Sequence, residues 1–402
     1  MKKLLLSAIT LMLSVNTNVF AANLDRLGGE NRYETAALIN NKMMSETLII
    51  ASGNDFADAL SSTSLVKYYN AEIHLVNKEL DTNTINSLNN NEFKKVIIVG
   101  GTKVISTDIE NELKLKLGSE NVKRIGGKDR YETSELIAAN VLEVNNSVNV
   151  AFIATGNDFA DALSVGPIAA YFGYPIILTP GDYIGKLGLS ILETVGGYYK
   201  IGGEAAISDN IDNLISNKSF QIKRLAGNNR YETNKAVIDE FYLSAFDHKT
   251  LYVASGLNFP DALAGSALAA KNKAPIVFIS NRAEATTQEV VNSFQNNSLI
   301  ALGGPAVVSD ETMQTLIENS ENREIVFKYK NKIVLSVEEG NIPTAEDICL
   351  VALDKEGKDC SETFSLRRVC IPEASDDDIG FMEFSVTMDG NDYFGSVTYT
   401  RE

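Results

Sequence analysis

The sequence has no tryptophan, only two histidines and only three cysteines among its 402 residues. Cys349, Cys360 and Cys370 all lie near the C-terminus, so disulfide bonds do not hold the preceding part together. Their spacing matches no C-x-x-C zinc or redox pair. His74 lies in an apolar run, where a packed ring is expected, and His248 is far away in the sequence. Neither G-x-S-x-G nor H-E-x-x-H occurs, which argues against serine-hydrolase and zinc-peptidase chemistry.

Long apolar runs are also absent after the N-terminus, and none has membrane-spanning length. At the N-terminus, Lys2 and Lys3 precede a short apolar run over residues 4–13, and Val19-Phe20-Ala21 supplies small residues for cleavage. This pattern predicts a signal peptide over residues 1–21 and a secreted, soluble mature protein. Three cysteines cannot all pair, so at most one disulfide bond and one free thiol are expected.

Positive charge is scarce as well: the chain carries 36 lysines and arginines against 53 acidic residues, a net charge of −17. Such a surface repels nucleic acids and anionic membranes as a whole. Any anionic ligand must therefore be bound by local features that overcome this repulsion.

Three motifs recur in the same order, three times. The first reads R-[LI]-[GA]-G-x-[ND]-R-Y-E-T, the second A-[ST]-G-x-[DN]-F-[AP]-D-A-L, and the third closes each repeat around a G-G pair. They begin at Arg26, Arg124 and Arg224, at Ala51, Ala154 and Ala254, and at Ile98, Lys200 and Ala301. A repeat of about 100 residues has the size of a small domain, so these are tandem domains and not solenoid turns. The predicted boundaries are 22–121, 122–222 and 223–321.

Within a repeat the hydrophobic period alternates between that of strands and that of helices. In the first repeat, residues 47–51, 73–76 and 96–99 read as apolar strands, and residues 55–69 and 107–117 read as helices. Continuous apolar strands that alternate with helices predict an α/β fold with a parallel sheet.

Residues 322–402 differ from the repeats. Short alternating or β-branched runs are separated by turn signals such as Asp389-Gly390 and predict a small all-β domain, a sandwich. The runs cover residues 324–330, 332–337, 348–353, 364–370, 382–386 and 393–399.

Several repeated polar residues have structural explanations. Asn31 with Glu34 forms a capping-box pattern, which recurs at Asp129 and Asn229, and Asp55 with Asp58 has the same spacing. The tyrosine of each R-Y-E-T motif is expected to be a packed ring with a hydrogen-bonded hydroxyl.

The candidate ligand-binding residues are two arginines per repeat and the glycine pairs beside them. A strand-to-helix turn at a glycine pair exposes N–H groups that can bind an anion, and the fork of arginine suits phosphate or carboxylate. The alternatives are plain tight turns and ion pairs between these arginines and the repeated aspartates. The candidates are Arg26, Arg32, Arg124, Arg130, Arg224, Arg230, Gly100, Gly101, Gly202, Gly203, Gly303 and Gly304.

The repeated motifs together resemble the cell wall binding repeat 2 family of clostridial and related Gram-positive surface proteins. The resemblance covers residues 24–320. It implies three Toprim-like or Rossmann-like modules in a pseudo-threefold arrangement, attached non-covalently to an anionic cell wall polysaccharide. Ala71-Glu72-Ile73-His74 departs from the P-I-L-L strand of the family, and the third repeat has Ala226, Leu257 and Pro260 at motif positions.

The resulting hypothesis is a non-catalytic surface-layer or cell wall protein, with no cofactor and no metal, that displays its C-terminal β domain. Surface-layer proteins or a host surface are further possible partners. Two alternatives stay open for residues 322–402: a wall hydrolase and an adhesin. Linked weak sites gain effective concentration, so three copies favour binding over catalysis.

Overall fold

The computed structural model describes residues 24–80, 82–90, 93–215, 221–246, 249–294, 298–321, 326–329, 350–353, 365–370, 379–388 and 391–400. The chain divides into two compact units, one up to Gln314 and one from Thr315 onward. The predicted signal peptide, the predicted strand over residues 332–337, Cys349, Cys360 and His248 lie outside the described residues.

Three four-stranded parallel sheets form the first unit. Their strand orders are β3-β2-β4-β5, β7-β6-β8-β9 and β1-β12-β10-β11, and every pair within them is parallel. The strands are β1 (Leu24–Leu27), β2 (Thr47–Ser52), β3 (Ala71–Val76), β4 (Lys95–Val99), β5 (Val122–Ile125), β6 (Val150–Thr155), β7 (Ile176–Thr179), β8 (Gly197–Ile201), β9 (Gln221–Leu225), β10 (Thr250–Ser255), β11 (Ile276–Ile279) and β12 (Ser298–Leu302).

Helices follow the strands in each repeat, as the alternating periods predict. The first repeat holds α1 (Arg32–Asn40), α2 (Phe56–Ser62), α3 (Leu65–Tyr69), α4 (Thr82–Asn90) and α5 (Thr107–Leu117), and a 3₁₀ turn over Ser119–Asn121 follows. The second holds α6 (Arg130–Val144), α7 (Ala160–Ser164), α8 (Gly166–Phe172), α9 (Lys186–Thr194) and α10 (Ile211–Leu214). The third holds α11 (Arg230–Ala245), α12 (Pro260–Lys271), α13 (Ala285–Ser293) and α14 (Asp310–Glu321).

The inner strands β2, β6 and β10 are apolar because both faces of each sheet are covered there. All six residues of β2 are buried, and Ile98 of β4 packs in one cluster with Ile109 and Leu113 of α5. The helix predicted over 107–117 therefore lies where the sequence placed it, with its apolar stripe against the sheet.

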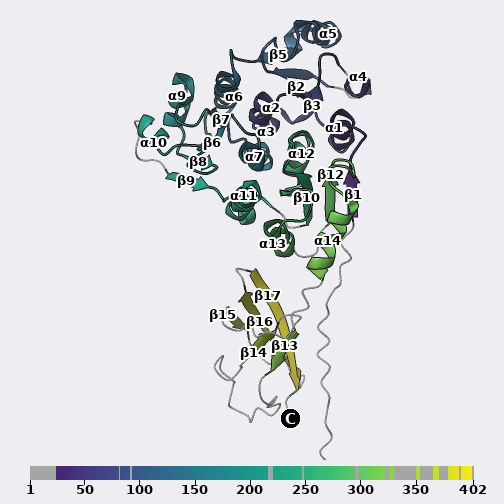
Figure 1. Cartoon of the computed structure of the whole chain (residues 1–402), viewed down its shortest axis with the longest axis vertical. Coiled ribbons are helices and arrows are strands. Elements are labelled where there is room, and N and C mark those ends of the chain that lie inside the picture. Colours follow the sequence, from purple (N-terminus) through teal and green to yellow (C-terminus); the bar gives the residue numbers. More distant parts are fainter. Residues whose placement is uncertain are drawn as a thin grey trace, which may run out of the picture. The chain divides into compact units, whose positions relative to one another are not determined.

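Each repeat gives its first strand to the sheet of the repeat before it. β5 and β9 open the second and third repeats, yet they pair with β4 and β8 of the preceding repeats. β1 opens the first repeat and pairs with β12 of the third, from Leu24 opposite Leu299 to Leu27 opposite Leu302. Figure 1 shows β1 lying beside β12. The third repeat thereby contacts the first, and the three repeats close on one another.

The three resulting boundaries are called seams: the first joins repeats 1 and 2, the second joins repeats 2 and 3, and the third joins repeats 3 and 1. Equivalent phenylalanines from all three repeats meet: the ring centroids of Phe56 and Phe159 are 5.9 Å apart, and each is 6.0 Å from that of Phe259. Later in each repeat, a Cβ atom on Gly166 of α8 would lie 2.5 Å from Ser266 Oγ of α12 and 3.9 Å from Cγ2 of Thr63, which follows α2. The near-equal spacing of the three phenylalanine rings confirms the expected pseudo-threefold α/β arrangement.

The second unit contains two antiparallel sheets. β13 (Val326–Tyr329) pairs with β14 (Leu350–Leu353), and β16 (Ile379–Met388) pairs with both β15 (Ser365–Cys370) and β17 (Asn391–Thr400). The β class expected for this region is confirmed for its described strands. The sandwich and the repeat boundaries stay predictions. Among the described residues, no helix is long and apolar enough to cross a membrane.

Candidate functional site

The candidate residues gather at the seams, near the carboxyl ends of the parallel strands, which is where open α/β sheets bind ligands. Each seam combines two loops of one repeat with the first helix of the next. At the first seam these are the loop after β2, the Gly100-Gly101 turn after β4, and the start of α6. The sequence motifs therefore mark contacts between repeats.

The first arginine of each motif clamps the glycine turn of the preceding sheet. Arg124 Nη1 donates to the Gly100 carbonyl at 2.8 Å, and its Nε donates to Glu110 Oε2 at 2.7 Å. Hydrogen bonds from Lys114 and Arg124 lower the pKa of Glu110. At the third seam, Arg26 bonds the Gly303 carbonyl at 2.7 Å and Asp310 at 2.6 Å.

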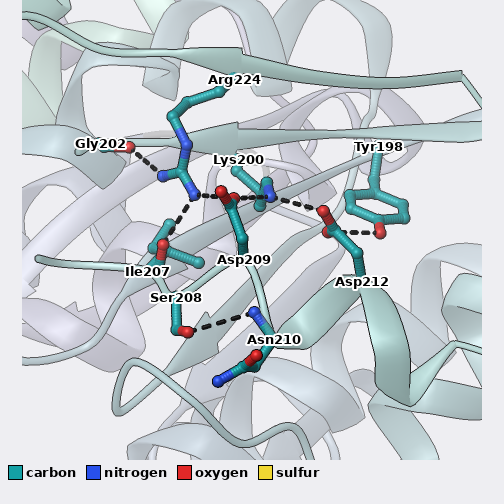
Figure 2. Close-up of polar contacts among 9 residues, drawn as sticks. All are labelled: Tyr198, Lys200, Gly202, Ile207, Ser208, Asp209, Asn210, Asp212 and Arg224. Carbon is teal, nitrogen blue, oxygen red and sulfur yellow. Dashed lines mark hydrogen bonds and ion pairs between the residues drawn. The ribbon is translucent and has the colours of Figure 1, made fainter. Parts of the chain in front are cut away.

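At the second seam this clamp extends into a larger polar network (Figure 2). Arg224 donates to the carbonyls of Gly202 (2.6 Å) and Ile207 (2.7 Å) and to Asp209 (2.7 Å). Hydrogen bonds from Lys200 and Arg224 lower the pKa of Asp209 to about 2. The network therefore keeps Asp209 ionised at pH values below the ordinary pKa of 3.8.

Lys200 stands in the otherwise apolar strand β8 and is only 4% exposed. Its Nζ donates to Asp209 and, at 2.7 Å, to Asp212 Oδ2, and the Tyr198 hydroxyl donates to the other Asp212 oxygen at 2.8 Å. Figure 2 shows Lys200 between the two carboxylates. Its buried charge is paired, as such a charge must be.

The second arginine of each motif lies against a phenylalanine of the preceding repeat. The guanidinium of Arg130 is 5.1 Å from the centroid of Phe56, that of Arg230 is 5.3 Å from Phe159, and that of Arg32 is 5.8 Å from Phe259. Cation–π contacts of this kind hold a guanidinium flat on a ring. Each of these arginines also donates to a main-chain carbonyl, of Gly156, Gly256 and Gly53 respectively.

The seams differ in how these three guanidiniums are neutralised. Arg130 pairs with Asp55 at 3.4 Å and Arg230 with Asp158 at 3.3 Å, across the first and second seams. The ion-pair alternative weighed for the motif is therefore correct for these two arginines. The third seam has Asn258 at the equivalent position. Among the described residues, no carboxylate oxygen lies within 4.0 Å of the Arg32 guanidinium.

A second aspartate lies at every seam, buried at the first and third and partly buried at the second. Asp58 and Asp261 are 5% and 6% exposed. Burial raises the pKa of Asp58 and raises that of Asp161 and Asp261 to about 6. Threonine hydroxyls and arginines of the following repeat act in the opposite direction, and for Asp261 the charge of Arg32 is the larger of these two effects. Within the described part of the chain, Asp58 Oδ1 has no hydrogen-bond partner. The capping-box role expected of Asp58 is wrong, because its side chain points into the seam, toward Gly100.

The glycine turns are tightly built. Gly100, Gly202 and Gly303 have φ of +112°, +117° and +109°, and a Cβ on any of them would lie within 2.7 Å of the buried aspartate. Their own N–H groups bond the main chain of the next edge strand, as Gly100 does to Ile125 at 2.8 Å. The following glycines, Gly101, Gly203 and Gly304, show no such bond among the described residues. Anion binding at these turns stays a prediction, as does direct ligand contact by the six arginines.

The helix caps differ in one detail from the expected box. Asn31 Oδ1 accepts bonds from the amides of Tyr33 and Glu34, as predicted. The Glu34 carboxylate accepts a hydrogen bond from the amide of Glu30 at 2.9 Å and not from that of Asn31. The amide one residue earlier is reached because the glycine turn folds back over the helix. The same shift occurs with Glu132 to Lys128 and Glu232 to Asn228.

The tyrosines and His74 are packed as expected. Tyr131 donates to Asn157 at 3.1 Å, and the ring of Tyr33 lies so near Gly53 that a Cβ there would be 2.7 Å from it. His74 is buried, with its Nε2 2.9 Å from Glu72. The described residues contain no cluster of histidine, cysteine or acidic side chains that could hold a metal.

Sequence comparison gives relatives for this arrangement. The chain is 33% identical over 321 residues to N-acetylmuramoyl-L-alanine amidase LytC and 31% identical over 298 residues to the amidase enhancer, both of Bacillus subtilis (strain 168). These matches cover 78% and 73% of this chain but only 62% and 40% of the relatives. The solved structure of Cwp8 from Clostridium difficile superposes with a TM-score of 0.67 at 29% identity, covering 74% of this chain and 52% of Cwp8.

The seam residues lie within three stretches that match a single family model. Residues 26–110, 124–212 and 224–313 each match Cell wall binding domain 2 (CWB2). The chain is therefore a member of the CWB2 cell wall binding family, with three tandem copies of its domain.

Proposed function

We propose that this protein is secreted and attaches non-covalently to an anionic cell wall polysaccharide through its three repeats, carrying the C-terminal β region as the displayed part. The observation that supports this most strongly is that all three repeats keep the family's motifs and use them in equivalent seams. Three equivalent seams on one rigid unit can engage successive units of a repeating polymer. Linked sites of this kind hold a polymer more tightly than any one of them could.

The contacts with the glycan are proposed at the seams, through the six arginines and the glycine pairs at 100–101, 202–203 and 303–304. Five of the six guanidiniums already pair with carboxylates, namely those of Arg26, Arg124, Arg130, Arg224 and Arg230. Arg32 has the least compensated charge of the six, so we propose that it makes the strongest contact with an anionic group. Its planar fork suits a carboxylate or phosphate.

The proposed location is the outer surface of the cell, in or beside a surface layer, where other surface-layer proteins or a host surface become available to the C-terminal region. The signal-peptide pattern at residues 1–21 supports export. An adhesive role for residues 322–402 is compatible with anchoring by the repeats.

Co-sedimentation with purified cell walls tests the anchoring. The chain without residues 1–21 is mixed with walls before and after chemical removal of their anionic polymer, and bound and free fractions are measured across a salt series. We expect retention on intact walls, weakening with salt because the contacts are charged, and loss of retention on stripped walls. Equal retention on stripped walls would contradict the polysaccharide as ligand.

We propose binding and not catalysis, although two relatives carry amidase in their names. The chain spans only part of both, so their activities do not transfer with the match. Incubation of the chain with peptidoglycan should release no new amino or reducing groups above a heat-treated control. Release at a steady rate would instead support the wall-hydrolase alternative.

A further inference from the structure

The third seam lacks a piece of helix that the other two seams possess. α1 has 9 residues, whereas the equivalent helices α6 and α11 have 15 and 16. At about 1.5 Å per residue, α1 stops roughly 9 Å short of its counterparts. The distant end of the third seam is therefore not covered as the other two are.

At the first two seams the extra helical turns cover aromatic residues of the preceding repeat. Tyr69 of repeat 1 donates to Asn140 of α6, and Tyr68 accepts from Asn145, which caps the end of α6, each at 3.0 Å. At the second seam Phe172 packs on Phe241 of α11, with ring centroids 6.3 Å apart.

The third seam replaces these aromatics with polar and charged residues. Counted from the shared phenylalanine, Tyr68 and Tyr171 correspond to Lys271, and Tyr69 and Phe172 correspond to Asn272. Lys271 donates to the carbonyl of Lys42, just beyond the shortened α1, at 2.9 Å. Both changes occur at the same place, so this seam is built differently.

A depression of about 320 Å³ occupies this place, where all three repeats meet. Its lining includes Met43, Met44, Lys67, Ala170, Tyr171 and Lys271. Its volume lies at the lower end of the range of small-molecule sites, which occur preferentially between domains. It lies at the end of α3, α8 and α12, whereas the axial phenylalanines lie at or just before the starts of α2, α7 and α12.

The charge of this depression is opposite to that of the molecule. Its described lining has two lysines and no carboxylate, on a chain of net charge −17. Lys67 Nζ bonds the Tyr171 carbonyl at 2.9 Å and lies 5.6 Å from the centroid of that ring. Both lysines thus bond carbonyls, and no carboxylate oxygen of the described residues lies within 4.0 Å of either ammonium group.

We propose that this pocket, called here the axial pocket, binds one small anion that carries a ring and methyl groups, such as an acidic N-acetylated sugar. The two ammonium groups bind its carboxylate or phosphate, and the Tyr171 ring offers a face for the sugar. The alanine and methionine walls accommodate methyl groups. The pocket exists once per chain, because only the third seam has the shortened helix.

Titration of the chain without residues 1–21, followed by calorimetry, tests the axial pocket. The probes are N-acetylmuramic acid and N-acetylglucosamine 6-phosphate. The controls are N-acetylglucosamine, which has the sugar ring without an acidic group, and acetate, which has the carboxylate without a sugar ring. We expect one molecule of an acidic sugar bound per chain and binding at least about tenfold weaker for both controls. A stoichiometry of three, or equal binding of N-acetylglucosamine, would overturn the proposal.

The double variant Lys67→Gln/Lys271→Gln keeps the size of both side chains and removes their charge. It should weaken binding of the acidic sugars about tenfold, while Lys116→Gln/Lys186→Gln, which removes the same charge elsewhere, should not. Equal melting temperatures would establish that the variants are folded, and undiminished sugar binding by the first variant would refute the pocket. The Lys67→Gln/Lys271→Gln variant should be retained on cell walls as well as the unaltered chain is. Failure of this proposal and failure of wall anchoring are therefore distinguishable.

Discussion

At the scale of the residue, the structural role of the repeated arginines is to connect neighbouring repeats. Each first arginine bonds a carbonyl whose glycine has positive φ, and each second arginine lies on a phenylalanine. The planar fork of arginine has five N–H donors in fixed directions, whereas lysine is a point charge on a flexible stem and would hold the same acceptors with less directional control. The chemistry that makes arginine suit an anionic glycan also makes it suit this internal role.

The network around Lys200 gives a prediction for one carboxyl group. Lys200→Met fits the apolar strand but removes the donor that contributes most to the low pKa of Asp209. A lowered pKa stabilises the fold at pH above the ordinary value near 3.8, and this contribution is lost as pH falls through about 2. We expect the pKa of Asp209 to rise toward its ordinary value in the variant, measured by NMR titration. An unchanged pKa would mean that Arg224 alone holds the carboxylate.

The buried Asp261 gives a prediction of the opposite sign. Its pKa is about 6 against an ordinary 3.8, so its contribution to stability is fully present below pH 3.8 and is lost as pH rises through 6. Asp261→Asn should raise the free energy of unfolding at pH 7 by about 1–3 kcal/mol and change it little at pH 4. Denaturant unfolding at the two pH values measures this. A variant that is less stable at pH 7 would show that the charge itself holds the third seam together.

At the scale of the element, local pattern predicted most of what the structure contains. The strand over 96–99, the helix over 107–117 and the three repeats follow from periodicity and from motif spacing, which depend on nearby residues. The partner of β1 could not be predicted, because pairing with β12 joins residues at opposite ends of the first unit. The sequence pattern of a first strand is the same whether the strand joins the sheet of its own repeat or that of the preceding repeat.

The same distinction applies to the candidate site. The arginines and glycine turns were visible as motifs, but their roles depend on contacts across the seams. Asn258 is visibly different from Asp55 and Asp158, yet only the fold places it beside Arg32 and not Arg230. The shortened α1 likewise follows from a shorter sequence between Arg32 and the next strand, but the axial pocket forms only where the three repeats meet.

Removal of β1 tests the closure of the three repeats. A chain that begins at residue 28 loses the β1–β12 ladder, the buried Leu27 and the clamp from Arg26 to Gly303. We expect its first unit to melt about 5–10 °C lower than that of the chain beginning at residue 22. Adding a synthetic peptide of residues 22–31 in excess should restore part of the difference. Equal melting of the two chains would contradict closure by this strand.

At the scale of the whole molecule, a strongly acidic protein is proposed to bind an acidic polymer. This is physically reasonable only if the seams present local positive charge that the net charge does not cancel. The seams are unequal in this respect, because the first and second have an aspartate beside the arginine and the third has an asparagine. The third seam is therefore proposed to bind the glycan most strongly.

The most direct test of this central claim changes the charge of the seams without changing their shape. Asn258→Asp gives Arg32 the partner that Arg130 and Arg230 have, and Asp55→Asn/Asp158→Asn removes theirs. Wall retention is measured against salt for both variants and for the unaltered chain. We predict that Asn258→Asp weakens retention about three- to tenfold at physiological salt and that the double variant strengthens it. Retention that is the same in all three proteins, with their folds intact, would contradict the claim that seam guanidiniums hold the wall polymer.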